Sequence, residues 1–230
     1  MFKKSSLSVL FACHYPIDVK TLYKIKLLST CLPFIDFSFY TTIAGYVELD
    51  NNDKSNLIKE FTKLKLSGEL LDFSRYSEFL ELTVTAENIM LINDTLGSGR
   101  KFNFGLWIYL FISCILIHLK IITIAAPVDR DQYRSWICPY FIIGQFTQLK
   151  KMNWQDWKSA KRNLTYEELC NIDTWLIQNW RSRKNATQVQ IDAKKKTLIL
   201  ERCLMDDVTK ASVLFSFSRR NPLRWLNSII

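Results

Sequence analysis

The residues best suited to chemistry follow a short apolar run at 89–92. Asn93, Asp94 and Thr95 come directly after that run, and a glycine-containing stretch follows them. Four bulky apolar residues bounded by turn formers are typical of a buried strand in an α/β sheet. Because ligands of open α/β sheets bind beyond the carboxyl ends of the strands, we expect Asp94 to lie in such a crevice. A carboxylate there can hold a divalent cation or the hydroxyl groups of a sugar.

Strands and helices that alternate along the chain are predicted to position this segment. Their apolar patterns indicate strands at 7–13, 34–40, 70–73, 89–93 and 121–126, and helices at 18–30, 57–68 and around 76–80. A further extended segment at 136–144 fits an edge strand or a mixed pairing. Alternating strands and helices imply parallel pairing through right-handed crossovers. The sequence therefore predicts an α/β fold with a mostly parallel sheet and flanking helices.

The length and composition fit a single domain over residues 1–230. With 48% hydrophobic residues, a chain of 230 residues can bury a sizeable core, which excludes a disordered or fibrous protein. We expect an α/β core at 1–150 and a helical C-terminal part at 151–230, in which 165–168 form a capping box. The six cysteines contain no CxxC pair and are expected to be reduced thiols.

The apolar run at 102–126 is long enough to cross a bilayer, which leaves two interpretations open. His118 and Lys120 lie inside the run, and a charge near the centre of a bilayer costs about 3 kcal/mol. A buried helix followed by the strand at 121–126 avoids this cost, and we expect that arrangement. The alternative is a small membrane protein that spans the bilayer with residues 102–126.

The net charge of +9 favours an anionic partner. Nucleic acid is not expected, because the basic residues are spread along the chain without a helix-turn-helix, zinc or RNA-binding signature. Basic clusters at 3–4, 194–196 and 219–220 favour an acidic membrane surface, at about 1 kcal/mol for each residue near that surface. Since the chain begins without a convincing secretory signal, we expect a cytoplasmic protein that lies peripherally at the inner face of the plasma membrane.

Five segments of the chain resemble segments of one enzyme family. They are 71–76 (LDFSRY), 89–95 (a strand, then Asn-Asp-Thr), 121–129 (a strand, small residues, proline and an acid), 140–144 (an aromatic strand) and 200–202 (Leu-Glu-Arg). In this order they resemble bacterial polysaccharide-building glycosyltransferases of the nucleotide-sugar-dependent GT-A type, and more narrowly the rhamnan-synthesis-like group.

The resemblance implies a single GT-A-like domain that moves a sugar from a nucleotide-sugar donor to a surface polysaccharide or a lipid-linked acceptor. Such a transfer needs positive charge beside the departing diphosphate, a carboxylate that accepts the acceptor's proton, and a pocket for base and ribose. The candidate donor-binding residues are Asn93, Asp94, Thr95, Arg75, Arg100, His14 and Asp36. The candidates for the general base are Asp129 and Glu201.

These roles follow from the residue types and their places along the chain. Arg75 and Arg100 can bind phosphate oxygens in a fork. His14 follows the first strand, where the resemblance places the nucleotide base. Asp129 and Glu201 each follow an apolar segment.

The candidate metal ligand is Asp94. The family's Asp-x-Asp metal pair is here Asn93-Asp94-Thr95, with one carboxylate instead of two. Mg²⁺ often uses only one or two carboxylates together with substrate phosphates, so a Mg²⁺ or Mn²⁺ ion is compatible with this segment. The missing carboxylate also favours an alternative, a degenerate transferase-like protein that binds its ligand without catalysis.

Overall fold

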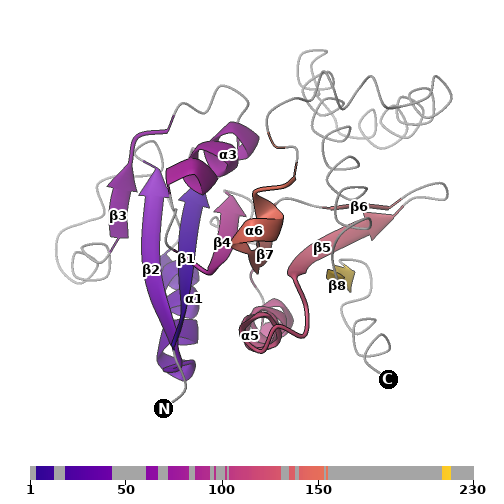
Figure 1. The fold of residues 1–230 in the computed structure, drawn as a ribbon. Helices are drawn as coiled ribbons and strands as arrows, with labels where there is room; N and C mark the ends of the chain where they lie inside the picture. The colour runs from indigo at the N-terminus through magenta and orange to yellow at the C-terminus, as the bar shows by residue number, and fades with distance from the viewer. Residues whose placement is uncertain are drawn as a thin grey trace, which may run out of the picture.

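The computed structural model of the 230-residue chain describes residues 4–12, 19–42, 61–66, 72–82, 86–93, 96, 102, 104–130, 135–137, 140–152, 154 and 214–218. The described helices and strands form an α/β arrangement in which one sheet lies between two layers of helices (Figure 1). The predicted α/β class is confirmed.

Four parallel strands form the N-terminal half of the sheet. They are β1 (Ser5–Ala12), β2 (Ile35–Thr42), β3 (Phe61–Leu64) and β4 (Asn88–Asn93), in the order β3-β2-β1-β4. All residues of β4 are buried, and so are all but one of β1. Continuous burial of this kind requires cover on both faces of the sheet, as the apolar runs predicted. The strands expected at 7–13, 34–40 and 89–93 are confirmed, with small differences at their ends.

The other half of the sheet contains antiparallel pairs. β7 (Phe141–Gln145) is antiparallel to β4 and to β5 (Ile124–Arg130), and β5 also pairs antiparallel with β6 (Ser135–Ile137) and parallel with β8 (Leu214–Ser218). The sheet is therefore mixed, and the prediction of a mostly parallel sheet is corrected. A parallel return to the sheet needs a long crossover, whereas only residues 131–140, which include β6, connect β5 to β7.

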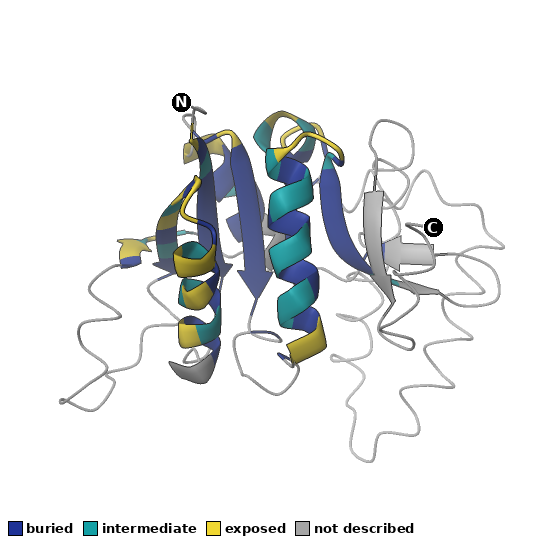
Figure 2. Ribbon diagram, turned by 90° about the horizontal axis from the view of Figure 1, so that it is seen from below, coloured by how far each residue is buried: buried dark blue, intermediate teal, exposed yellow. Residues whose placement is uncertain are grey.

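Among the described elements, two helices cover each face of the sheet. α1 (Val19–Cys31) and α5 (Phe104–His118) lie side by side on one face (Figure 2). The indole Nε1 of Trp107 in α5 donates a hydrogen bond to the backbone oxygen of Lys24 in α1, at 2.8 Å. α3 (Asp72–Leu82) and α6 (Phe146–Leu149) cover the other face, where Phe79 packs on Tyr40 of β2 with ring centroids 5.2 Å apart.

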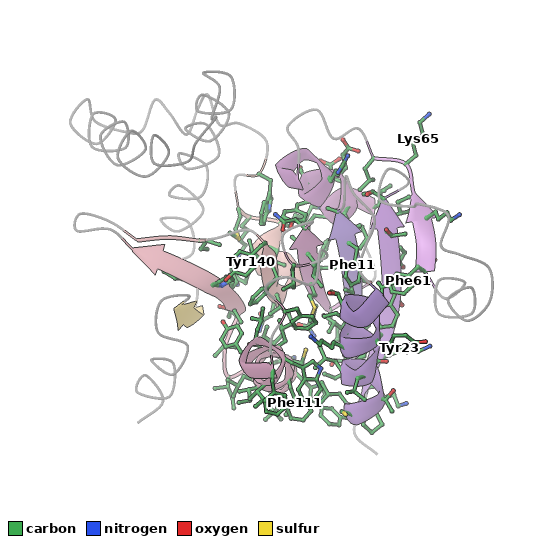
Figure 3. The ribbon with its side chains drawn as sticks, turned by 180° about the vertical axis from the view of Figure 1, so that it is seen from behind. Phe11, Tyr23, Phe61, Lys65, Phe111 and Tyr140 are labelled. Atoms are coloured by element: carbon green, nitrogen blue, oxygen red, sulfur yellow. The ribbon has the colours of Figure 1, made fainter. Side chains whose placement is uncertain are left out.

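Aromatic side chains fill the core beneath these helices. Phe11 of β1 is fully buried and meets Phe61 of β3, with ring centroids 5.6 Å apart (Figure 3). Tyr109 of α5 meets Phe141 of β7 at 5.7 Å. The first contact joins β1 to β3 within the parallel half of the sheet, and the second joins β7 to α5.

Two predicted elements between β2 and β4 are wrong. The helix expected at 57–68 is contradicted by β3, which pairs with Phe39–Thr42 of β2. Apolar residues at helical spacing suggested that helix, but Phe61 packs instead between Phe11 and Phe39, and tertiary contact overrides local pattern. The strand expected at 70–73 is contradicted because α3 already begins at Asp72.

The apolar run at 102–126 divides as expected into a helix and a strand. α5 ends at His118, and Lys120, with a positive φ of 59°, turns the chain toward β5. In the part of the chain that the structure describes, no helix combines the length and apolar character needed to cross a membrane.

The C-terminal part was expected to be helical, but Leu214–Ser218 form a strand, β8, so the prediction is wrong for these residues. β8 extends the sheet beside β5, so this part of the sequence contributes a strand to the core architecture. The capping box at 165–168 lies outside the described residues, and the division of the domain at residue 150 stays a prediction.

Candidate functional site

The strand order creates a switch point between β1 and β4. From β1 the chain builds the sheet outward through β2 and β3, and it then returns to add β4 on the other side of β1. In α/β sheets, the loops that leave two such strands at their carboxyl ends diverge and form the usual ligand-binding crevice. Ala12, the last residue of β1, pairs with Asn93, the last residue of β4. The crevice is therefore expected directly beyond Ala12 and Asn93.

One hydrogen bond joins the connections that follow these two strands. Thr21, in the first turn of α1, donates from Oγ1 to the backbone oxygen of Leu96, at 3.4 Å. Both residues are fully buried. The amino end of α1 therefore adjoins the segment that follows β4, and a helix amino end carries a positive potential that favours anions.

Asn93 is the part of the Asn-Asp-Thr motif that the structure describes. It is buried at the carboxyl end of β4, with 8% of its surface exposed. Its backbone nitrogen donates to the backbone oxygen of Tyr140, at 3.1 Å, which holds the end of β4 against the start of β7. The chain thus leaves the sheet toward Asp94 and Thr95 from a fixed point, while those two residues lie outside the described part.

Arg75 lies on the side of α3 that faces the sheet, near the same edge. α3 leads into the amino end of β4, so it runs away from the carboxyl edge of the parallel strands. Phe79 contacts Tyr40, the sixth residue of the eight in β2, and Arg75 comes one turn, or about 6 Å, earlier in the helix. Figure 1 shows α3 over the tips of the parallel strands. Arg75 therefore lies toward the carboxyl edge.

The guanidinium group of Arg75 is buried without a full set of partners. The residue is only 6% exposed, and neither Nε nor Nη1 has a hydrogen-bond partner among the described residues. A buried cation costs several kcal/mol unless an anion or hydrogen-bond acceptors compensate for its lost hydration. This environment suits a ligand with negatively charged oxygens.

Several other predicted site residues lie outside the described residues. They are His14, Asp94, Thr95, Arg100 and Glu201. Asp94 is the residue on which the predicted cation depends, so Mg²⁺ or Mn²⁺ stays a prediction. Among the residues that are described, no three His, Cys, Asp or Glu side chains gather into a metal-binding group.

Asp36 lies at the opposite end of the sheet from Asn93. It pairs with Ser6 near the start of β1, whereas Asn93 pairs with Ala12 at the end of that strand. Six residues of strand separate the two levels, which corresponds to about 20 Å. The exposed carboxylate of Asp36 is therefore not brought together with Arg75 and Asn93.

Asp129 is described only in its backbone, near the carboxyl end of β5. β7 pairs with β5 only at Ile124 and Ala125, and Asp129 pairs instead with Trp136 of β6. Figure 1 shows this end of β5 diverging from β4. The sheet does not hold Asp129 next to Asn93.

Two buried titratable side chains, those of Tyr109 and Cys114, belong to α5 and do not lie at the carboxyl edge. Burial raises the pKa of Tyr109 well above its usual value, and the hydroxyl donates to the backbone oxygen of Ala126 at 3.4 Å. Burial also raises the pKa of the Cys114 thiol from 9.0 to about 12. Both groups stay protonated at neutral pH, so they pack as neutral core residues.

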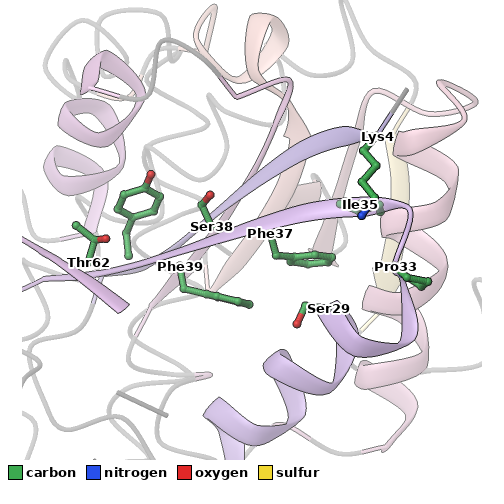
Figure 4. A pocket seen from close by; sticks show the side chains of 9 residues that line it. Lys4, Ser29, Pro33, Ile35, Phe37, Ser38, Phe39 and Thr62 are labelled. Carbon is green, nitrogen blue, oxygen red and sulfur yellow. The ribbon is translucent and has the colours of Figure 1, made fainter. Parts of the chain in front are cut away.

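A pocket of about 560 Å³ lies elsewhere, along the open edge of β2. β3 pairs only with Phe39–Thr42, so the first half of β2 has no β3 residue beside it. Phe37, Phe39, Ser29 and Lys4 are among the residues that line this pocket (Figure 4). It lies next to the amino half of β2, away from the switch point between β1 and β4.

At the carboxyl edge of β1 and β4, the sequence patterns did not single out Thr21 and Tyr140. Thr21 sits in an ordinary amphipathic helix, and Tyr140 was noted only as part of an aromatic strand. No sequence pattern marks Thr21, because it is the third residue of α1 and its hydrogen bond reaches a residue 75 positions away.

Comparison with known proteins adds no family to this picture. No family model matches the chain, and a search of curated proteins finds no match either.

Proposed function

We propose that this protein transfers a sugar from a nucleotide-sugar donor to a growing surface polysaccharide or a lipid-linked precursor. The observation that carries the proposal is Arg75, a buried guanidinium toward the carboxyl edge of the parallel strands whose Nε and Nη1 are unpaired among the described residues. A diphosphate offers oxygens at the spacing that the fork of a guanidinium binds. In this role Arg75 offsets the negative charge that develops on the departing nucleoside diphosphate.

The position of the switch point supports a nucleotide as the ligand. Dinucleotides and mononucleotides bind in open α/β sheets at the crevice where the strand order reverses. Here the amino end of α1 adjoins that crevice through the bond between Thr21 and Leu96. Together, the helix end and Arg75 supply positive potential from the two faces of the sheet.

The remaining parts of the reaction are assigned to residues that the sequence singled out. Asp94 is proposed to contact the donor sugar or to hold one Mg²⁺ or Mn²⁺ ion with the donor phosphates, with Asn93 and Thr95 beside it. Arg100 and His14 complete the proposed donor site, which no longer includes Asp36. Asp129 or Glu201 is proposed to accept the proton of the acceptor hydroxyl.

We propose a single GT-A-like domain over residues 1–230, at the cytoplasmic face of the plasma membrane and held there peripherally. The net charge of +9 and the basic clusters at 3–4, 194–196 and 219–220 support an acidic surface as the neighbour.

Calorimetric titration with a panel of UDP- and dTDP-sugars, with and without Mn²⁺, tests this function. We expect one donor to bind and to be consumed when a lipid-linked acceptor is present. Asp94→Ala should abolish donor binding and leave thermal unfolding nearly unchanged. Binding without turnover would support the degenerate transferase-like alternative, and the absence of binding to any donor would contradict the proposal.

A further inference from the structure

The outer side of α5 is a surface that the proposed reaction does not use. None of the fifteen residues of α5 is Asp, Glu, Lys, Arg, Asn or Gln. Its polar side-chain groups are those of Ser113 and His118, together with the Tyr109 hydroxyl and the Trp107 indole, which donate to backbone oxygens of neighbouring elements. Ser113 is fully buried, and its hydroxyl donates to the backbone oxygen of Tyr109 at 2.7 Å. The helix therefore presents apolar side chains both to the sheet and to its outer side, where a covering helix normally carries polar residues.

We define the α5 outer face by its apolar residues that are half-buried or exposed. They are Phe104, Trp107, Ile108, Phe111, Ile112, Ile115 and Leu116, together with Leu119 directly beyond the end of the helix. At the two ends of this face, Phe104 is 73% exposed and Leu119 is 58% exposed. Figure 2 shows α5 lengthwise, half-buried along its outer side and exposed at its ends, and Figure 3 shows Phe111 on the side turned away from the sheet.

Aromatic rings form a continuous row along this face. Phe104 and Trp107 stack with centroids 6.4 Å apart, and Trp107 and Phe111 stack at 5.5 Å. The hydrogen bond from Trp107 to Lys24 holds the row against α1. Aromatic residues with a fixed orientation are favoured where a protein meets the boundary between headgroups and acyl chains.

The charged residues of α1 and of the sequence around α5 are all positive. α1 contains three lysines and no acidic residue, and the sequence from residue 95 to residue 128 contains no Asp or Glu. Lys120 is exposed directly beyond the carboxyl end of α5. A two-fold dimer through this face would bring like charges together, whereas an anionic surface would complement them.

We propose that the α5 outer face docks on an anionic lipid bilayer, with α5 lying in the plane of the interface. Fifteen helical residues extend about 22 Å, which is less than the apolar thickness of a bilayer of about 30 Å, so the helix rests in the interface instead of crossing it. This inference rests on the proposed function, because it names the surface through which a transferase reaches a lipid-linked acceptor.

The placement of α5 relative to the candidate site is consistent with this role. α5 connects the carboxyl end of β4 to the amino end of β5, so Phe104 begins the helix on the carboxyl-edge side of the sheet. A bilayer against the α5 outer face then lies close to the edge at which the donor is proposed to bind.

Vesicle flotation with the full-length protein tests the proposal. We expect the protein to float with vesicles of phosphatidylcholine that contain about one-third phosphatidylglycerol, and to float much less with phosphatidylcholine alone. Replacing two exposed apolar side chains, in Phe104→Glu/Leu119→Glu, should weaken partitioning about a hundredfold. Lys120→Gln should weaken it about fivefold.

Matched variants elsewhere on the molecule are the controls. Leu82→Glu changes a side chain that is 62% exposed at the end of α3, on the other face of the sheet, and should float like wild type. Lys65→Gln removes an exposed charge beyond β3 and should also have no effect. Circular dichroism checks that the substituted proteins are folded. If the Phe104→Glu/Leu119→Glu variant does not fold, the comparison of Lys120→Gln with Lys65→Gln tests the docking surface.

Three results would overturn the proposal. They are wild-type protein that stays unbound to the anionic vesicles, a Phe104→Glu/Leu119→Glu variant that floats like wild type, and a wild-type dimer in solution that this variant dissociates. Nucleotide-sugar titration of the same variants separates the two proposals. A protein that floats but binds no donor refutes the proposed function alone, and one that binds a donor but does not float refutes only the docking surface.

Discussion

At the scale of single residues, Arg75 is the side chain whose surroundings are most informative. It is buried on the sheet-facing side of α3, and two of its nitrogens have no partner among the described residues. A structural ion pair and a site for an anionic ligand both account for a buried arginine, but they predict opposite effects on stability. Removing one member of a buried ion pair costs about 3–5 kcal/mol, whereas removing an unpaired buried charge stabilises or is neutral.

We predict that Arg75→Met leaves the free energy of unfolding unchanged or raises it by about 1–3 kcal/mol, because methionine fills the space without a charge. The same substitution should weaken binding of a UDP- or dTDP-sugar by about tenfold to a hundredfold, since hydrogen bonds to charged groups contribute about 1.5–3 kcal/mol. Urea unfolding and calorimetry measure the two effects. Arg75→Lys, which keeps the charge but not the fork, should show an intermediate affinity.

A loss of more than about 3 kcal/mol in Arg75→Met, with donor affinity unchanged, would assign Arg75 to a structural ion pair and remove it from the donor site.

Cys114 makes the stability depend on pH in the alkaline range. Its folded-state pKa is raised to about 12 by burial, above the value of 9.0 for an exposed thiol. Between these values the unfolded chain gives up the thiol proton while the folded chain keeps it, so stability falls as pH rises. The stability difference between wild type and Cys114→Ala should shrink by about 1.4 kcal/mol per pH unit above pH 9.

Urea unfolding of both proteins at a series of pH values measures this difference. A difference that stays constant from neutral pH to about pH 10.5 would show that the thiol titrates normally in the folded protein.

At the scale of elements, the close approach of β7, β5 and α6 depends on Gly144. A Cβ atom at this position would lie 3.0 Å from the backbone oxygen of Thr123, 3.1 Å from Ile124 Cγ1 and 3.2 Å from Leu149 Cδ2. The oxygen of Thr123 cannot move freely, because it accepts a hydrogen bond from the backbone nitrogen of Gln145 at 2.9 Å.

We predict that Gly144→Ala lowers the free energy of unfolding by about 1–3 kcal/mol through overpacking. Gly105→Ala, at an exposed position in the first turn of α5, should be neutral or stabilise by up to about 1 kcal/mol. Equal effects of the two substitutions in thermal unfolding would contradict the close packing of β7 against β5 and α6.

The elements show how far local pattern could predict this fold. Continuous apolar runs identified β1 and β4, because strands buried on both faces leave a clear signature. β3 was mistaken for part of a helix. Its four residues are held in place by contacts of the Phe61 ring with Phe11 and Phe39, which are far from Phe61 in the sequence. The place of β7 between β4 and β5 was not predictable, because alternation and burial carry no information about which neighbour a strand takes.

At the scale of the whole molecule, the sequence identified the edge of the sheet better than the set of residues at that edge. The end of the buried run at Asn93 marks the carboxyl edge correctly, since a strand must end where turn formers begin. Asp36 was included because it faces one side of its strand and could contact a nucleotide, whereas the structure places it level with Ser6 at the other end of the sheet. Thr21 was missed because its contact with Leu96 joins residues that are far apart in the sequence.

Two regions of the molecule are candidates for the nucleotide site. The crevice proposed for the donor lies beyond the carboxyl ends of β1 and β4, whereas the pocket of about 560 Å³ lies along the open edge of β2. The nucleotide is proposed to bind at the first of these places. The residues that follow β1 and β4 in the sequence are 13–18 and 94–101.

Photolabelling with an azido derivative of UDP, followed by mass spectrometry of the labelled peptides, tests this claim most directly. We predict saturable labelling, competed by unmodified nucleotide sugar, within residues 13–18, 94–101 or the first turns of α3. Saturable labelling confined to the peptides around Lys4 and Phe37 at the edge of β2, or no labelling that a nucleotide sugar competes, would contradict the account.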